Sequence, residues 1–513
     1  MSWMNKKANH LLLLFFVVLK FILQYFLINP VYDLHRDEYL HLDQANHLAW
    51  GYQSVPPFTA FVSSVIKLLG NGVFWVKFFP ALFGVLTLVV TWKMIERLNG
   101  GIFARVLAAT AFIFSVILRL NTLYQPNSAD ILFWTLFYFC IILFIQAEQN
   151  KWLLVLGVIT GIGLLNKYNI IFLLIGLAPS VLLSEQRKIL LNRYFYFSAC
   201  IALLIVLPNI YWQCTNNFPV IHHMKDLSAT QLVNNNRIDF IKEQFLFFTG
   251  AFYLAPLALL GFWLYPPFKK YRLISWSFLF TISFFIYLKA KGYYALGLYP
   301  VLLAFGSVYT EKLLSSGWKQ KVRWVLPVLI ILVFVPFIKV VFPVMKPEVI
   351  REKAAAFESL DLLKWEDGKE HELPQDFADM LGWKELAIKV DAEYGQLDSQ
   401  KTIVICDNYG EAGAINYYSA FKNIQAVSFN ADYINWFPFE KDIRNVILVN
   451  EAGGAIPNKF VSHFRQAYHA GRITRSLARE KGTWIYVLKD AGQPVNDILR
   501  EQIRLVKEHH KGF

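Results

Sequence analysis

Neither the cysteines nor the glycines of this sequence form the short motifs of several common protein classes. Its four cysteines are scattered through 513 residues without a Cys-x-x-Cys pair or a Cys/His spacing, so the sequence indicates neither a disulfide framework nor a zinc site. The phosphate-binding motifs Gly-x-Gly-x-x-Gly and Gly-x-x-x-x-Gly-Lys-Ser/Thr do not occur. Charge is also scarce, because Asp, Glu, Lys and Arg supply only 17% of the residues. These shortages exclude a disulfide-rich secreted protein and do not favour an ordinary soluble enzyme.

Apolar side chains are abundant instead. They make up 56% of the chain, and the mean hydropathy is +0.39. Because a membrane-spanning helix needs about 20 apolar residues, such values predict an α-helical polytopic membrane protein. We expect about eleven spans, at residues 11–29, 73–95, 102–120, 131–147, 152–165, 170–183, 194–212, 244–264, 272–288, 293–310 and 324–343. The first run continues past Lys20 to Ile28 without a small-residue cleavage site, so we expect it to remain uncleaved.

The formal net charge of +13 indicates a membrane topology rather than nucleic-acid binding. Lys and Arg cluster in short loops between apolar runs, which is the bias of cytoplasmic loops. With the N-terminus inside, the clusters fall on successive cytoplasmic connections: Lys93, Arg97 and Arg105; Lys151; Arg187, Lys188 and Arg193; Lys269, Lys270 and Arg272; Lys312, Lys319, Lys321 and Arg323. We therefore expect membrane lipids, and no nucleic acid, among the partners of this chain.

Two apolar segments have lengths that do not suit an upright span. Residues 56–69 are too short to cross and begin with Pro56-Pro57, so we expect a helix that lies at the outer interface. Residues 152–183 are too long for one span and short for two. Because Lys151 and the cluster at Arg187 should lie on the same side, we expect two short helices that meet at residues 166–169 and line a cavity there.

The character of the sequence changes after Met345. Charges become frequent and short apolar runs alternate with helical patterns, so we expect a soluble α/β domain at 346–513 after a membrane domain at 1–345. An odd number of spans places this domain on the outer, periplasmic face. Strands are expected at Thr402–Cys406, Ile424–Phe429, Asn445–Val449 and Thr483–Leu488, and a helix at Phe377–Glu393. The glycine-bearing turn 407–413 is expected to be an ordinary βα connection rather than an anion site.

The first external loop, residues 30–72, contains adjacent acids at Asp37 and Glu38. One carboxylate of such a pair can accept a proton from an incoming nucleophile. The alternative is that these acids cap the helix expected at 39–50. Asp130 presents the same choice, because it follows Asn-Ser-Ala and immediately precedes a charge-free span at the same membrane face.

Several cations on the outer side break the positive-inside bias: Arg36, Arg119, Lys167, Lys289 and Lys291. Each one alone is explained by a long side chain that reaches the interface. Together they are suited to a basic pocket for a phosphate headgroup. Lys167 fits the first explanation least well, because short apolar helices flank it on both sides.

We expect no metal. The adjacent His222 and His223 of the external loop 213–240 are poorly spaced to ligate one ion. Asp-x-Asp, the metal-binding signature of soluble nucleotide-sugar transferases, does not occur in the chain.

Taken in order, these segments resemble bacterial family-39 glycosyltransferases, which are relatives of the protein O-mannosyltransferases and of the aminoarabinose transferase that modifies lipid A. The resemblance rests on His35-Arg36-Asp37-Glu38, Leu48–Tyr52, Pro56-Pro57, Asp130–Trp134, Gly163–Tyr168, Leu207–Asn209, Lys289–Tyr294, Tyr299-Pro300, Leu373–Gln375, Gly382-Trp383 and Asn408–Ala414. It covers essentially the whole chain, and the order and spacing of the segments support it more than any single motif does.

The resemblance implies a membrane fold of the GT-C type with an outward-facing active site and a sugar donor carried on a polyprenyl phosphate. Position by position, Asp37 matches the catalytic acid of the first loop, Glu38 its neighbour and Asp130 the second acidic position. Lys167 and Lys291 match basic positions that face the donor phosphate.

Arg36 and Lys289 are expected beside these two lysines as further phosphate-binding residues. One departure concerns metals, because the aminoarabinose transferase has Glu-Lys-Pro where this chain has Ser54-Val55-Pro56. A carboxylate that could contribute to a metal site is missing there, so neither a metal nor another cofactor is expected.

The sequence therefore predicts a membrane glycosyltransferase of the bacterial inner membrane. It would move a sugar from a polyprenyl phosphate to a glycolipid, a cell-envelope glycan or a protein on the outer face, with inversion and with Asp37 as general base. The alternative is a transporter or flippase of lipid-linked sugars. Transporters of that kind usually contain internal repeats and charged or broken helices near the midplane, whereas this sequence shows no repeat and its ionisable residues gather at one face.

Overall fold

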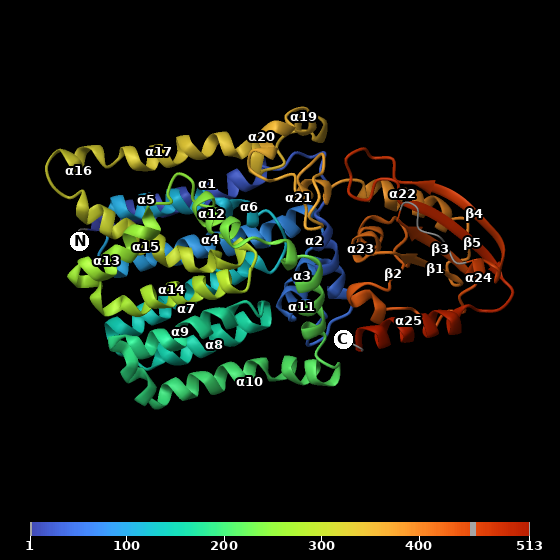
Figure 1. Cartoon of the computed structure of the whole chain (residues 1–513), viewed down its shortest axis with the longest axis horizontal. Helices are drawn as coiled ribbons and strands as arrows, with labels where there is room; N and C mark the ends of the chain where they lie inside the picture. The colour runs from blue at the N-terminus through green and yellow to red at the C-terminus, as the bar shows by residue number, and fades with distance from the viewer. Residues whose placement is uncertain (1–2, 452–457, 512–513) are drawn as a thin grey trace.

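The computed structural model describes residues 3–451 and 458–511 of the chain. A bundle of roughly parallel helices forms one part, and an α/β part lies at one end of it (Figure 1). The N-terminus lies at the opposite end of the bundle from the α/β part. The predicted fold class, a polytopic helical protein with a C-terminal α/β domain, is confirmed.

Long apolar helices form the bundle. Its principal members are α1 (Trp3–Phe26), α4 (Val73–Arg97), α7 (Asn127–Ala147), α8 (Lys151–Asn166), α9 (Ile170–Leu183), α10 (Arg193–Thr215), α13 (Leu254–Leu264), α14 (Arg272–Tyr287), α15 (Tyr299–Leu313) and α17 (Val325–Phe334). Among the described residues, five helices are long and apolar enough to cross a membrane, or six if the bent pair Ile170–Leu183 and Glu185–Leu191 is one span. The total of about eleven spans remains a prediction.

Several expected spans are interrupted. Residues 102–120 divide into α5 (Ile102–Ile113) and α6 (Val116–Leu120), and Ser115 caps the second helix. Residues 244–264 are not one helix, because α12 (Arg237–Leu246) ends before α13 begins at Leu254. At this break Gly250 approaches the backbone of α17 so closely that a Cβ atom would lie 2.8 Å from Ile330 Cα. Close packing between neighbouring helices thus overrides the apolar run.

The end of the bundle that faces the α/β part carries short elements from the loops that the sequence predicts to be external (Figure 1). They include α2 (Arg36–Asp43), α3 (Phe58–Leu68) and α11 (Pro219–Thr230). The helix expected within 56–69 is confirmed as α3, although its position at a membrane interface remains a prediction. The junction expected between residues 152 and 183 is confirmed as well, since α8 ends at Asn166 and α9 begins at Ile170.

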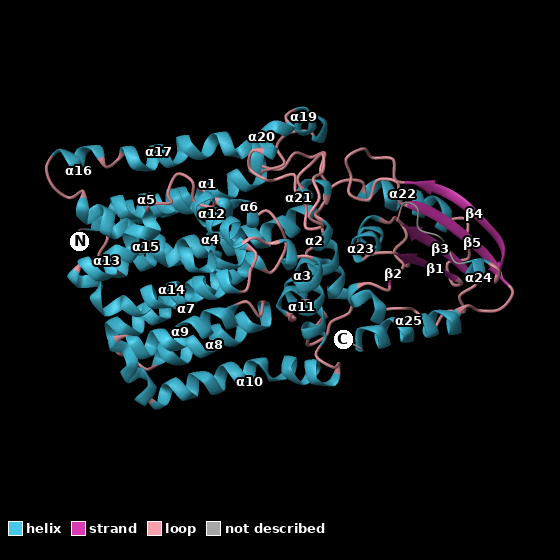
Figure 2. Cartoon of the chain, in the orientation of Figure 1, coloured by secondary structure: helices cyan, strands magenta, loops and turns pink. Residues whose placement is uncertain are grey.

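The α/β part contains a five-stranded sheet in the order β2-β1-β3-β5-β4 (Figure 2). Its strands are β1 (Thr402–Cys406), β2 (Ala426–Ser428), β3 (Asn445–Asn450), β4 (Phe464–Arg472) and β5 (Trp484–Ala491). β1 pairs in parallel with β2 and β3, whereas β5 pairs antiparallel with β3 and β4. All four expected strands are present. The edge strand β4 escaped sequence analysis because most of its residues are exposed and it has no run of apolar side chains.

Helices cover both faces of this sheet. α22 (Trp383–Tyr394) and α23 (Tyr409–Tyr418) pack on one face, and α25 (Asn496–Lys511) packs on the other. The helix expected at Phe377–Glu393 was wrong at its start, because α21 (Gln375–Ala378) ends and Gly382 turns the chain with a φ of 89°. Only glycine adopts such a φ without strain.

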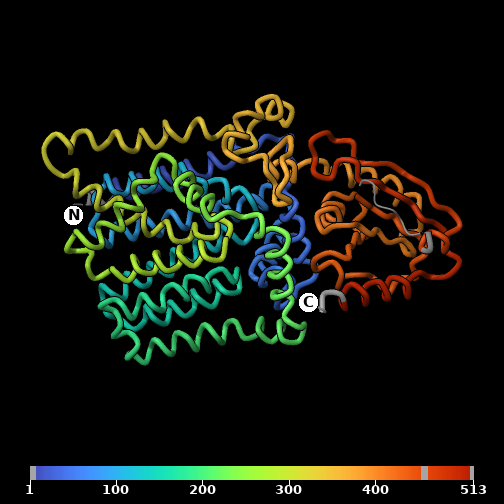
Figure 3. The backbone as a smooth tube through the Cα atoms, in the orientation of Figure 1, coloured from blue at the N-terminus to red at the C-terminus, as the bar shows by residue number. Residues whose placement is uncertain are grey.

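One hydrophobic core runs from the α/β part into the first external loop. Leu34, Tyr39 and Leu40 of that loop are buried in the same cluster as Trp383 of α22 and Ala412 of α23. The tube in Figure 3 shows α2 at the junction between the two parts. A domain boundary at residue 345 remains a prediction, and apolar packing fixes the α/β part against α2.

Candidate active site

His35 and Glu38 cap the helix that carries the adjacent acids. The Nδ1 atom of His35 accepts the Asp37 N–H at 3.2 Å, and Oε2 of Glu38 accepts the His35 N–H at 2.7 Å. These two bonds form a reciprocal capping box at the start of α2. The capping role that the sequence left open between the two acids therefore belongs to Glu38, and the carboxylate of Asp37 is not needed for it.

Glu38 is fully buried and has no free oxygen. Lys77 Nζ from α4 lies 2.6 Å from Oε1 and 2.7 Å from Oε2, and the Tyr124 N–H donates to Oε1 at 2.7 Å. A buried carboxylate needs such partners, because an unpaired buried charge is very costly. Glu38 therefore ties α2 to α4 and to the loop before α7.

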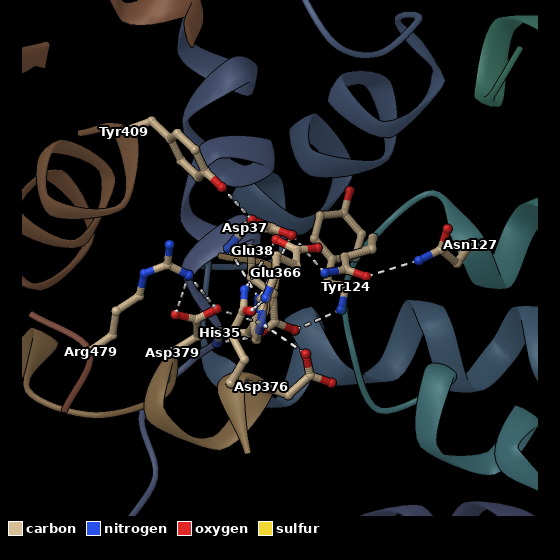
Figure 4. A network of polar contacts seen from close by, with 12 residues as sticks. His35, Asp37, Glu38, Tyr124, Asn127, Glu366, Asp376, Asp379, Tyr409 and Arg479 are labelled. Atoms are coloured by element: carbon tan, nitrogen blue, oxygen red, sulfur yellow. Dashed lines mark hydrogen bonds and ion pairs between the residues drawn. The ribbon is translucent and has the colours of Figure 1, made fainter. Parts of the chain in front are cut away.

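Asp37 lies where three elements meet (Figure 4). Its Oδ1 accepts a hydrogen bond from Tyr409 Oη of α23 at 2.7 Å, and its Oδ2 accepts one from Gln125 Nε2 at 2.9 Å. The side chain is 37% exposed, whereas that of Glu38 is 0% exposed. Of the two acids, Asp37 is the one that a second molecule can approach.

The surroundings of Asp37 favour its ionised form. Burial raises the pKa of this carboxyl, but His35, the Tyr409 hydroxyl, Arg36 and His41 outweigh that effect and lower the pKa below its ordinary value. One turn along α2, burial lowers the pKa of His41, although Asp37 opposes this change. At neutral pH the site therefore presents an ionised Asp37 carboxylate.

A chain of hydrogen bonds connects Asp37 with Lys167. Gln125 donates to Asp37, Asn127 Nδ2 donates to Gln125 Oε1 at 2.9 Å, and Lys167 Nζ donates to Asn127 Oδ1 at 2.7 Å. Every donor in the chain points from the cation toward the carboxylate, so the bonds reinforce one another. Lys167 also lies over the ring of Tyr294, 4.5 Å from its centroid.

Lys291 lies on the same side of the site. Its Nζ donates to Gln231 Oε1 at 2.7 Å and forms an ion pair with Glu366, and it is close enough to act electrostatically on Lys167. The structure thus brings two of the expected phosphate-binding residues together. Lys289 differs, because within the described part of the chain its side chain makes no polar contact.

Asp130 is buried beneath this region and faces the junction of α8 and α9. Its Oδ1 accepts Trp134 Nε1 at 3.0 Å and its Oδ2 accepts Asn169 Nδ2 at 2.8 Å. Asn169 also donates to the Tyr294 carbonyl at 3.0 Å. Asp130 therefore holds the segment on which Lys167 is mounted, and it does not contact Asp37 directly.

Arg36 points toward the α/β part. Its guanidinium stacks on Tyr409, 4.3 Å from the ring centroid, and lines a cavity of about 320 Å³. The cavity is lined by Arg36, Trp365, Glu366, Asp367, Gln375, Glu451, Arg479, Glu480, Lys481 and Thr483. Glu366 of this cavity also pairs with Lys291, so the cavity adjoins one of the expected phosphate-binding residues.

Three side chains extend the network around His35. Its Nε2 lies 3.8 Å from a carboxylate oxygen of both Asp376 and Asp379, and Asp379 accepts two hydrogen bonds from Arg479, at 3.1 and 3.2 Å (Figure 4). Burial raises the pKa of Asp379, although Arg479 opposes this change. The arrangement fixes the imidazole whose other nitrogen caps α2.

Sequence analysis missed Tyr409, Gln125 and Asn127 as site residues. The two amides are neutral side chains in a loop, and no charge pattern marks them. Tyr409 carried one signal, because it precedes Gly410 and Gly413, whose three-residue spacing predicts a close approach to a helix face. Among the residues that the structure describes, no group of three or more His, Cys, Asp or Glu side chains is arranged to hold a metal ion. The expectation of a metal-free site remains a prediction.

Comparison with known proteins supports the resemblance seen in the sequence. Residues 54–212 match the family described as dolichyl-phosphate-mannose-protein mannosyltransferase. Lipid A galacturonosyltransferase RgtD of Rhizobium johnstonii is 26% identical over 222 residues, which are 42% of this chain and 46% of that protein. The match therefore spans less than half the length of this curated relative.

Solved structures extend the similarity to nearly the whole chain. ArnT from Cupriavidus metallidurans bound to undecaprenyl phosphate has a TM-score of 0.59 and 12% identity, over 92% of this chain and 97% of ArnT. The apo form gives the same TM-score and identity over 94% and 98% of the two chains. The chain therefore has the fold of ArnT, which is the GT-C type of fold that the resemblance implied.

Proposed function

We propose that this protein is a membrane glycosyltransferase that moves a sugar from a polyprenyl phosphate to an acceptor at the outer face, with Asp37 as general base. The observation that carries the proposal is the polar chain from Asp37 through Gln125 and Asn127 to Lys167. It places an accessible carboxylate and a cation in one connected network. These are the two groups that a transfer from a sugar phosphate requires.

The reaction follows from this arrangement. The acceptor hydroxyl or amine gives its proton to the Asp37 carboxylate as it attacks the anomeric carbon. The bond between that carbon and the phosphate oxygen breaks from the opposite face, and its electron pair leaves with the phosphate. A displacement from the opposite face inverts the configuration of the sugar.

Lys167 and Lys291 are proposed to hold the donor phosphate. A cation that faces the leaving oxygen stabilises the charge that develops there, and the fixed network needs little reorganisation during the reaction. General base catalysis by a positioned carboxylate contributes about 10²–10⁴ in rate. Glu38 and Asp130 are proposed to position the groups around the reaction, because both are buried with their oxygens bonded.

The classes of donor and acceptor are supported by the relatives. ArnT was solved with undecaprenyl phosphate, and RgtD is named for its action on lipid A. We propose a polyprenyl-phosphate sugar as the donor and a lipid of the lipid A type as the acceptor. The proposed site is the inner membrane of a bacterium, with Asp37 and the α/β part facing the periplasm.

Mass spectrometry of the cell envelope tests the proposal. Envelope glycolipids and glycoproteins are compared between cells that carry the gene, cells that lack it, and deletion cells that carry a plasmid-borne copy. We expect one glycolipid signal, heavier than its precursor by one sugar, to disappear with the gene and return with the plasmid. Identical envelopes in all three strains would contradict the proposed activity.

A further inference from the structure

The α/β part contacts α2, the helix that carries Asp37, at unusually short range. The glycines of α23 make this contact possible. A Cβ atom at Gly413 would lie 2.8 Å from Tyr39 Cβ, and one at Gly410 would lie 2.6 Å from Arg36 Cγ. Real Cβ atoms avoid such distances, so only glycine allows α23 to lie this close to α2. The contact places the first residue of α23, Tyr409, directly beside Asp37.

Resting on the proposed function, we infer that the α/β part is a component of the active site, in which Tyr409 is a positioning residue for the Asp37 carboxylate. The Tyr409 hydroxyl donates to Asp37 Oδ1 at 2.7 Å, and Gln125, in the bundle just before α7, donates to Asp37 Oδ2 at 2.9 Å. One oxygen is thus fixed by each part of the protein. The carboxylate plane cannot rotate without breaking one of these two bonds.

The direction of the Tyr409 hydrogen bond is set by its surroundings. Burial and the neighbouring Asp37 raise the pKa of this phenol well above its ordinary value. The hydroxyl therefore keeps its proton at any pH that the protein meets and acts as the donor. A donor of this kind stabilises the ionised carboxylate and not the protonated one.

Arg36 strengthens the arrangement by stacking on Tyr409. Its guanidinium stacks on the face of Tyr409, and its buried Nε has no hydrogen-bond partner in the described chain. The guanidinium therefore covers one face of the ring. Tyr409→Phe removes the hydroxyl and keeps the ring, so it tests the hydrogen bond to Asp37 without changing this packing.

Several charged or titratable groups interact with Asp37. They are His35 before α2, Arg36 and His41 on α2, Tyr409 on α23, Asp379 after α21, and Tyr293 of η5 (Gly292–Leu298). Tyr409→Phe changes only one of them. It removes an interaction that lowers the pKa of Asp37, so that pKa should rise. Because the base must be ionised, the acidic limb of the pH–rate profile should move to higher pH.

The experiment uses membranes from the deletion strain that carries each full-length variant, since these membranes contain their own donor and acceptor. Formation of the gene-dependent glycolipid is measured between about pH 2.5 and 8, because the wild-type limb is expected below the ordinary Asp pKa of about 3.9. For Tyr409→Phe we expect the acidic limb to move up by roughly one pH unit, with roughly tenfold slower transfer below it and near-normal transfer at high pH. Protein level and thermal midpoint are measured alongside.

Tyr417→Phe is the matched control. It lies on the same helix and donates its hydroxyl to the Asn71 carbonyl at 2.8 Å, so it contacts the membrane part without contacting Asp37. Its profile should match that of the wild type. A Tyr409→Phe profile with the wild-type limb, or one that is lowered equally at every pH, would overturn the inference. Asp37→Asn is run in parallel, because an active Asp37→Asn protein would instead contradict the proposed general base.

Discussion

Gln125 Nε2 donates a hydrogen bond to Asp37 Oδ2 at 2.9 Å across 88 residues of sequence. Gln125 in turn accepts a hydrogen bond from Asn127, whose carbonyl oxygen accepts one from Lys167. The neutral side-chain amides of Gln125 and Asn127 therefore connect the Lys167 cation with the proposed base, Asp37.

Loss of Gln125 should slow transfer without affecting donor binding. Gln125→Ala removes a hydrogen bond to a charged group, which contributes about 1.5–3 kcal/mol, so we expect transfer roughly ten- to hundredfold slower. Binding of undecaprenyl phosphate by the purified protein should be unchanged. Gln146→Ala, which affects the other end of α7, serves as the control and should behave like the wild type. A Gln125→Ala protein with normal turnover would show that the chain has no part in the reaction.

Donor binding should depend on the two lysines. Lys167→Ala and Lys291→Ala are expected to weaken binding of undecaprenyl phosphate, and Lys→Glu at either position should be worse, because the phosphate then meets a like charge. Isothermal titration in detergent measures this effect. Lys242→Ala on α12 is the control, since this exposed lysine forms an ion pair with the nearby Asp239. If both alanine variants bound the lipid phosphate as the wild type does, the lysines would be interfacial anchors only.

The helical bundle was predictable from the sequence for a simple physical reason. Apolar runs and loop charges are local signals, and each of them constrains the chain without knowledge of its neighbours. The interruption at Gly250 could not be predicted in this way. The apolar run 244–264 does not reveal it, because the break depends on the close approach of α17. Helix boundaries set by a partner cannot be predicted from the helix alone.

The site was predictable only in part, and for the same reason. Asp37 and Lys167 were recognisable because charge at the end of an apolar run is costly and therefore informative. Tyr409 contacts Asp37 across 372 residues, and that contact exists only after the α/β part has docked. The different surroundings of the two adjacent acids were not predictable either. The Glu38 carboxylate is buried and pairs with Lys77, whereas the Asp37 side chain is partly exposed.

Docking of the α/β part should be sensitive to side-chain volume at Gly413. Gly413→Ala places a Cβ atom 2.6 Å from Tyr433 Oη and 2.8 Å from Tyr39 Cβ, and overpacking of this kind typically costs 1–3 kcal/mol. We expect a lower thermal midpoint and faster proteolysis between the two parts. Gly492→Ala is the control, because nothing lies within 4 Å of its Cβ position. Equal stability of the two variants would show that α23 can move away from α2 at little cost.

The orientation in the membrane is tested by reporter fusions. The clusters of Lys and Arg predict that a reporter active only in the periplasm is active when fused after Met345 and silent when fused after Arg272. Fluorescence from a cytoplasmic reporter at the same two positions should give the opposite pattern. Reversed results would move Asp37 and the α/β part to the cytoplasmic face.

The proposed mechanism depends most on Asp37. The substitution Asp37→Asn keeps the size of the side chain and removes its charge and its ability to accept a proton. The capping box of α2 does not use this carboxylate, so the helix should form as before. We expect normal insertion, retained binding of undecaprenyl phosphate, and transfer slower by about 10²–10⁴.

Glu38→Gln is the comparison that separates chemistry from folding. It removes the charge that neutralises Lys77 in a buried pair, and breaking such a pair typically costs 3–5 kcal/mol. We therefore expect Glu38→Gln to lower the thermal midpoint strongly while each folded molecule still transfers sugar. Asp37→Asn should show the reverse, a stable protein without transfer. Near wild-type transfer by Asp37→Asn would exclude this carboxylate as the base and leave the fold unaffected.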